Sequence, residues 1–161
     1  MSACHQLLVI GFGNGECSDD GLGPALARAV EALGLPDVQV ESLLELHVED
    51  SLDVLLADLV LFVDATVSGE APFHLERLVP EEPKAFTAHE VSPAALLGIV
   101  ALLHDGAPDA YLLTLAGQDF RRFHTGLSSV AQCNLAAALR FLLPLLEARD
   151  PTAFRDACQP L

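Results

Sequence analysis

Short apolar runs alternate along the chain with segments in which apolar residues recur every three or four positions. The apolar runs have the length of buried strands and occupy residues 7–12, 38–44, 59–64 and 111–116. The segments with helical spacing occupy residues 18–33, 48–56, 92–103 and 126–146. Because strands and helices alternate, the pattern predicts an α/β fold, a three-layer sandwich in which a twisted, mostly parallel sheet of about five strands lies between helices.

The remaining segments are less regular. Residues 71–83 are rich in proline and glutamate and are predicted to form a hairpin at the edge of the sheet, followed by a short strand at 85–87. From Glu147 the sequence turns polar, which predicts a frayed tail. A chain of 161 residues has the length of one domain, so we expect a single domain over residues 1–161 with a polar tail from about residue 147.

Charge and composition narrow the classes of function. The chain has 23 acidic and 8 basic residues and therefore a net charge of −15. This charge argues against binding of nucleic acid, because phosphate binding needs clustered Lys and Arg. No apolar run reaches the ~18 residues of a membrane span, and the N-terminus lacks the pattern of a secretory signal. The cysteines, Cys4, Cys17, Cys133 and Cys158, form no C-x-x-C pair. With no apolar heptad pattern that would indicate a dimer, we expect a cytoplasmic monomer with neither a membrane nor a nucleic-acid partner.

A glycine-rich stretch follows the first predicted strand, and ligands of parallel α/β sheets bind at the carboxyl ends of strands. The pattern Gly11-x-Gly13 is by itself a weak sign of a dinucleotide-binding loop. The helix that follows opens with Glu16, Asp19 and Asp20, and three carboxylates would repel a pyrophosphate. We therefore expect no nucleotide cofactor.

The same edge of the sheet is predicted to carry a metal site made of Asp20, Asp64 and His89. Asp64 ends the third apolar run and His89 precedes the third helical segment, so both can meet Asp20 at one rim. Two carboxylates and an imidazole suit nickel, zinc or a similar divalent ion, and three protein ligands leave positions for water or for a ligand from a partner. Structural roles are the alternative: a helix cap is the favoured role of Asp19, and spacing alone leaves both roles open for Asp64 and His89.

Side-chain nucleophiles are weakly indicated. The chain lacks the H-E-x-x-H pattern of zinc peptidases and the G-x-S-x-G pattern of serine hydrolases. Ser18, Ser92 and Cys17 are candidates by residue type alone. Cys17 could be a soft metal ligand, although a bystander thiol is the favoured interpretation.

Several motifs, in this chain order, resemble those of the NiFe hydrogenase maturation proteases. The motifs are Gly11-x-Gly13-Asn14, Asp19-Asp20-Gly21-x-Gly23, Phe62-Val63-Asp64-Ala65 and His89-x-Val91-Ser92-Pro93 followed by Leu96-Leu97. The resemblance covers residues 7–146. It implies a twisted sheet between helices. It also implies a hydrolase, an endopeptidase that removes the C-terminal extension of the hydrogenase large-subunit precursor after nickel insertion.

The resemblance further implies roles for individual residues. The metal-contacting positions of the family fall on Asp20, Asp64 and His89, which are thereby implied to be both the catalytic and the metal-binding residues. The nickel would arrive with the substrate precursor, and another divalent ion such as zinc would substitute for it. The attacking group is left open between a carboxylate and a metal-polarised water, and the roles of Glu41 and Glu45 are not assigned.

Two other functions remain open at this point. A receiver-like phosphoacceptor signalling domain also carries acids after its first strand, an aspartate after its third and a divalent cation, but it needs a lysine after a later strand. The last apolar run is followed by Gly117-Gln118-Asp119, and Lys84, the only lysine, lies earlier. A non-catalytic metal-binding chaperone would keep the acids and His89 but would lack peptidase activity.

Overall fold

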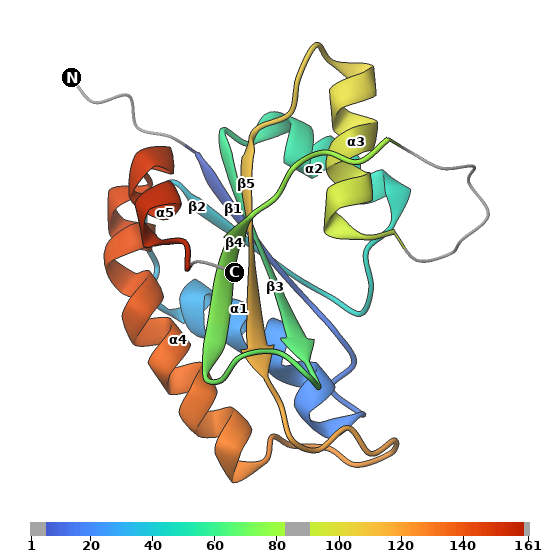
Figure 1. Cartoon of the computed structure of the whole chain (residues 1–161), viewed down its shortest axis with the longest axis vertical. Coiled ribbons are helices and arrows are strands. Elements are labelled where there is room, and N and C mark those ends of the chain that lie inside the picture. The colour runs from blue at the N-terminus through green and yellow to red at the C-terminus, as the bar shows by residue number, and fades with distance from the viewer. Residues whose placement is uncertain (1–5, 83–90, 160–161) are drawn as a thin grey trace.

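The computed structural model describes residues 6–82 and 91–159, which contain one mixed five-stranded sheet of order β2-β1-β3-β5-β4 (Figure 1). The strands are β1 (Leu7–Phe12), β2 (Val38–Leu43), β3 (Leu59–Thr66), β4 (Phe73–Arg77) and β5 (Asp109–Ala116). β1 pairs in parallel with β2 and β3, and β3 pairs in parallel with β5, whereas β4 runs antiparallel at the edge. The predicted mostly parallel α/β sheet is confirmed.

Helices cover both faces of this sheet (Figure 1). They are η1 (Ser18–Gly21), α1 (Leu22–Ala32), η2 (Val48–Asp50), α2 (Ser51–Leu56), α3 (Pro93–Leu103), α4 (Ser129–Ala148) and α5 (Pro151–Ala157). α1, α4 and α5 pack on one face and α2 and α3 on the other. In β3 the side chains alternate between the two faces. Leu61 and Val63 pack in the core covered by α1, α4 and α5, and Phe62 packs in the core covered by α2 and α3. β3 is therefore buried on both sides, which explains its uninterrupted apolar sequence.

The predicted frayed tail is wrong, because α5 follows α4 and packs on the sheet. Phe154 is completely buried, and its ring lies 5.3 Å from that of Tyr111 between centroids. Asp150 caps the helix by accepting a hydrogen bond from the amide of Thr152 at 2.9 Å. One aromatic residue in a short polar segment is too weak a periodic signal to predict a helix, but burying it against Tyr111 stabilises one.

The edge of the sheet also differs from the prediction. In the described part of the expected hairpin, residues 71–82, only one strand forms, and it pairs with β5. The expected strand at 85–87 lies outside the described residues. The C-terminal segment covers part of the exposed edge: the amide of Gln159 donates to the carbonyl of Leu75 at 3.1 Å, and the amide of Leu75 donates to the side chain of Gln159 at 3.2 Å.

By length and composition alone, α4 is apolar enough to cross a membrane. One side of it, which includes Ala131, Ala138 and Leu142, is instead buried against the sheet and α1. Its exposed Pro144 is tolerated, and the helix continues to Ala148. The core helix of a globular domain has these same properties, so α4 is weak evidence for a membrane span.

Candidate functional site

A cleft opens at the carboxyl ends of β1 and β3, where the chain order of the sheet changes direction. From β1 the chain moves to β2 on one side, and from β3 it moves toward β5 and β4 on the other. The resulting cavity has a volume of about 520 Å³. Its lining residues are Phe12, Gly13, Asp20, Leu44, Glu45, Leu46, Asp64, Ala65, Val91, Ser92 and Pro93. This is where open α/β sheets bind their ligands.

The glycines after β1 bring the chain back onto the sheet and thereby place Asp20 at the cleft. A Cβ on Gly13, which has φ of 144°, would collide with the carbonyl oxygen of Asp20, so the two backbones approach more closely than a side chain permits. Asp20 is half-buried, and its Oδ2 accepts a hydrogen bond from the amide of Asn14 at 2.7 Å. Gly23 similarly allows the first turn of α1 to pack on the carbonyls of Phe12 and Val63. The glycine motif is thus explained by close packing and by the placement of Asp20.

Asp64 reaches the same cavity from β3. It lies in register with Thr114 of β5 and is half-buried. Its Oδ1 accepts a hydrogen bond from the amide of Ala65 at 2.8 Å. In the alternation of β3 it lies on the same face as Phe62, the face covered by α2 and α3. Two of the three predicted site residues, Asp20 and Asp64, therefore line one cavity.

The third predicted site residue, His89, lies outside the described residues. The segment Val91 to Pro93, which begins two residues after it, lines the cavity at the start of α3. Ser92 caps this helix by accepting a hydrogen bond from the amide of Ala95 at 3.1 Å, a structural role for one of the candidate nucleophiles. Within residues 6–82 and 91–159, no three His, Cys, Asp or Glu side chains form a group suited to a metal ion.

Sequence reasoning left Glu45 unassigned, and the structure places it in the cavity lining with Asp20 and Asp64. The signal that could have found it is its position two residues beyond the end of β2, at the edge of the sheet that carries the site. Glu41 lies within β2 and is not among the residues that line this cavity. Three carboxylates therefore line the cleft, although they do not come together as one metal-binding group within residues 6–82 and 91–159.

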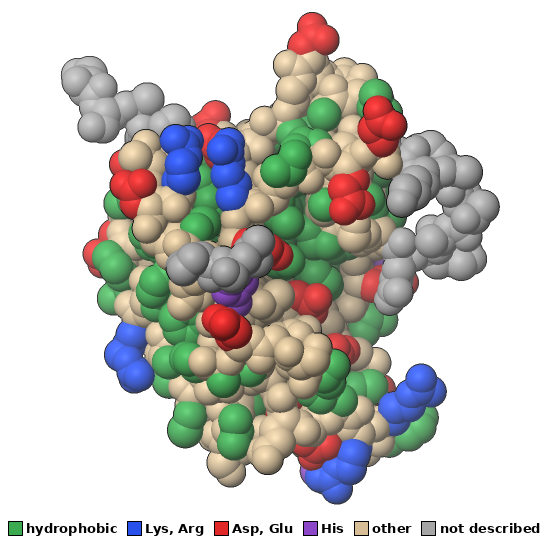
Figure 2. Space-filling view, viewed as in Figure 1, with side chains coloured by type: hydrophobic (Ala, Val, Ile, Leu, Met, Phe, Trp, Pro, Cys, Tyr) green, Lys and Arg blue, Asp and Glu red, His purple; other side chains and the backbone are tan. Residues whose placement is uncertain are grey.

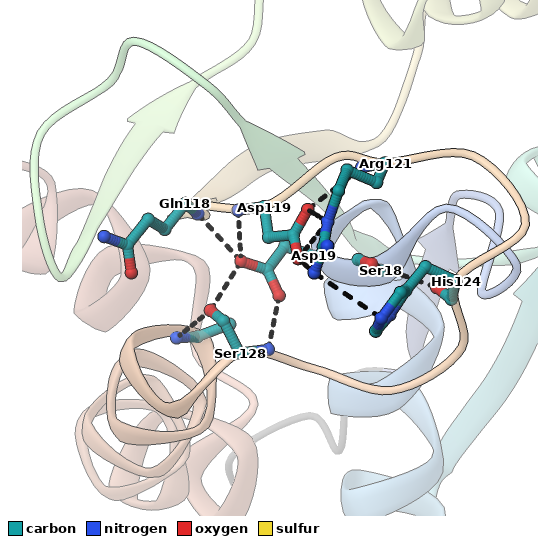
Figure 3. A network of polar contacts seen from close by, with 8 residues as sticks. Ser18, Asp19, Gln118, Asp119, Arg121, His124 and Ser128 are labelled. Carbon is teal, nitrogen blue, oxygen red and sulfur yellow. Dashed lines mark hydrogen bonds and ion pairs between the residues drawn. The ribbon is translucent and has the colours of Figure 1, made fainter.

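Asp19 does not cap its own helix, contrary to the sequence-based preference. Its carboxylate is completely buried and binds the loop after β5 (Figure 3). Oδ2 accepts hydrogen bonds from the amides of Gln118 and Asp119 at 2.8 and 2.9 Å and from Ser128 Oγ at 2.6 Å. Oδ1 accepts one from the amide of Ser128 at 2.7 Å. Ser128 also caps α4. Asp19 therefore connects the segment between β1 and α1 to the loop between β5 and α4.

These contacts keep Asp19 ionised. Burial raises the pKa of this carboxyl, but the hydrogen bonds from the Ser128 hydroxyl and from the amides of Asp119, Gln118 and Ser128 outweigh it, so the pKa is lowered overall. Its neighbour Asp20 carries no comparable set of donors, since the amide of Asn14 is the one hydrogen-bond partner found for its carboxylate among the described residues. The two adjacent aspartates therefore differ in role: Asp19 is structural and Asp20 faces the cleft.

A second set of bonds joins the same two loops. The amide and hydroxyl of Ser18 both donate to the carbonyl of His124, at 2.8 and 3.0 Å (Figure 3). The amide of His124 donates to the carbonyl of Glu16 at 3.0 Å. Ser18 is buried and does not line the cavity, which argues against a nucleophilic role. Cys17 lines a smaller neighbouring cavity with Asp20, so its thiol lies near the site but outside the main cleft.

The sheet order argues against the receiver-like alternative. Doubly wound receiver domains have the order 2-1-3-4-5, whereas here the edge strand β4 is antiparallel and precedes β5 in the chain. The residues after β5 form the loop held by Asp19. Among the described residues, no lysine is present to contact a phosphoryl group at this edge.

Comparison with solved structures identifies proteins of the same fold. The crystal structure of HycI, a NiFe hydrogenase maturation protease from Thermococcus kodakarensis, matches with a TM-score of 0.71 and 20% identity over 91% of this chain and 95% of that chain. The hydrogenase maturating endopeptidase HybD from E. coli matches with a TM-score of 0.67 and 25% identity over 89% and 93%. A hydrogenase 2 maturation peptidase from a Thaumarchaeota archaeon matches with a TM-score of 0.62 and 21% identity over 88% and 97%.

These neighbours confirm the resemblance indicated by the sequence motifs, and the similarity extends over nearly the whole length of both chains. No protein-family model matches the sequence, and neither does any curated protein.

Proposed function

We propose that this chain, which has the fold of the NiFe hydrogenase maturation proteases, is an endopeptidase that removes the C-terminal extension of a hydrogenase large-subunit precursor after nickel insertion. The observation that carries the proposal is the convergence of Asp20 and Asp64 in one cleft at the carboxyl ends of β1 and β3. The segment from Val91 to the start of α3 at Pro93, which begins two residues after His89, borders the same cleft. The similar solved structures suggest the class of reaction, peptide hydrolysis, and the carboxylate-lined cleft is where we expect it to occur.

In this proposal the nickel is part of the substrate. The ion carried by the precursor binds to Asp20, Asp64 and His89, which form a mixed oxygen and nitrogen set suited to nickel. Binding places the peptide bond to be cleaved in the cleft and makes cleavage conditional on nickel insertion. The attack is delivered by a carboxylate or by a water that the ion polarises. Glu45, which lines the same cleft, is a further carboxylate available to accept a proton.

The setting of the reaction follows from the same proposal. The precursor is the expected partner, zinc is an expected substitute for nickel, and the protein is expected to act as a cytoplasmic monomer. Its net charge of −15 supports the absence of a nucleic-acid partner.

The experiment that tests the proposal is incubation of the protein with nickel-loaded and nickel-free precursor, followed by intact-mass measurement. We expect the nickel-loaded precursor to lose its C-terminal extension and the nickel-free precursor to stay intact. Retention of the full mass in both samples, with nickel bound by the protein, would instead indicate a non-catalytic chaperone. Equal cleavage of both samples would remove the nickel-recognition part of the proposal.

A further inference from the structure

The loop between β5 and α4 carries a basic and aromatic tip beside the cleft. We define the tip as Arg122 and Phe123. The side chain of Phe123 is 92% exposed, the largest value among the exposed large apolar residues of the described chain. Its φ of 59° lies in the left-handed region, which residues other than glycine rarely adopt. In Figure 2 basic side chains gather at the lower right, over this loop.

Hydrogen bonds on both sides of the tip hold the loop that carries it. Asp19 binds the loop at both ends, through Gln118 and Asp119 at its start and Ser128 at its end. Midway, the carbonyl of His124 accepts hydrogen bonds from the amide and hydroxyl of Ser18 (Figure 3). A surface whose conformation is set in advance loses less entropy when a partner binds to it.

The tip is continuous with the proposed active site. A second cavity of about 330 Å³ is lined by Asn14, Glu16, Cys17, Asp20, Arg122 and Phe123. Asp20 lines this cavity and the main cleft, so it lies at the junction of the two. A chain that extended from the cleft to the tip would therefore have to pass Asp20.

The tip is positively charged, whereas the whole protein has a net charge of −15. Arg121 is already paired, since its guanidinium donates to Asp119 at 2.7 Å and its presence lowers the pKa of that carboxyl to about 2. For the Arg122 side chain no hydrogen bond or ion pair occurs with any residue in 6–82 or 91–159. Arg122 is therefore a cation available to a partner.

We propose that the tip binds an extended segment of the precursor next to the cleaved bond, with an apolar side chain of that segment on Phe123 and an acidic one on Arg122. This inference rests on the proposed function and adds the chemistry of the substrate segment. Phe123 supplies most of the affinity, because burying an aromatic ring is worth more than an exposed ion pair. Arg122 supplies the direction of binding, because its cation attracts the acidic side chain of the segment to one end of the tip.

Cleavage kinetics test the inference. We expect Phe123→Ala and Arg122→Glu each to lower kcat/KM for nickel-loaded precursor roughly tenfold or more, mainly through KM. The matched controls are Leu56→Ala, an 80% exposed side chain beside the amino end of β1, and Arg140→Glu on the exposed side of α4. Both controls should cleave like the unmodified protein. Tip variants with unchanged KM would overturn the inference and leave the proposed function intact.

A binding measurement separates the tip from catalysis. The probe is a fluorescein-labelled peptide, Ala-Ile-Glu-Leu-Asp-Val, compared with its neutral counterpart Ala-Ile-Gln-Leu-Asn-Val, and binding is followed by polarisation and by amide shifts in NMR spectra. We expect the acidic peptide to bind more tightly, to shift the amides of Arg122 and Phe123, and to lose about tenfold in affinity with either tip variant. Such binding without any cleavage of precursor would refute the proposed function alone. Shifts confined to other surfaces, or a dimer that dissociates on Phe123→Ala, would refute the tip as a substrate surface.

Discussion

Replacing Asp20 or Asp64 by Asn is expected to leave the fold intact and to reduce cleavage of nickel-loaded precursor at least about a hundredfold. The amide oxygen of Asn can still accept the hydrogen bond that the amide of Asn14 gives to Asp20. What the substitution removes is the negative charge that binds a divalent ion. Cleavage is measured by intact mass under single-turnover conditions, and folding by urea denaturation.

The matched control for this prediction is Asp53→Asn, an exposed carboxylate on α2 away from the main cleft. It should change neither cleavage nor stability. Normal cleavage by folded Asp20→Asn and Asp64→Asn variants would contradict the assignment of both residues. Loss of cleavage accompanied by unfolding would assign them a structural role instead.

Asp19→Asn is expected to cost about 2–4 kcal/mol of the free energy of unfolding, because several hydrogen bonds to one buried charged group are lost together. The carboxylate of Asp19 accepts four hydrogen bonds, three of them from backbone amides. An Asn side chain would direct its NH2 group at N–H donors and could satisfy only part of this set. Urea denaturation at pH 7 measures the loss.

The same residue predicts a dependence of stability on pH. Because the pKa of Asp19 is lower in the folded protein than its ordinary value of 3.8, the contribution of this carboxylate is fully present above that value. It is lost as the pH falls below 3.8 through the folded-state pKa. The unmodified protein should therefore lose more stability than Asp19→Asn between pH 5 and pH 2, and the two curves should converge. If the free energies of unfolding of the two proteins changed in parallel over this range, Asp19 would not be an ionised carboxylate that stabilises the fold.

The sequence was sufficient to predict the elements with strong periodicity. β3 is buried on both faces and reads as a continuous apolar run. α3 begins where Ser92 and Pro93 predict a start. The approach of Asp20 to Asp64 was also predictable, since Asp20 follows β1, Asp64 lies near the carboxyl end of β3, and the carboxyl ends of these neighbouring parallel strands share one edge.

The features that were missed depend on contacts between distant parts of the chain. Asp19 binds residues about one hundred positions later, and a carboxylate at a helix start has the same local sequence whether it caps that helix or binds a remote loop. α5 is stabilised by Phe154 against Tyr111, a pair that no local pattern reveals. The antiparallel direction of β4 is decided by its pairing with β5 rather than by its composition.

The central claim is that Asp20, Asp64 and His89 bind one divalent ion. A crystal structure of the protein with zinc, with the ion located by anomalous scattering, tests it most directly. We expect a single strong peak in the cleft at about 2.0–2.2 Å from carboxylate oxygens of Asp20 and Asp64 and from a ring nitrogen of His89. A peak bound by other side chains, or a His89 ring that points away from an ion held by the two aspartates, would contradict it.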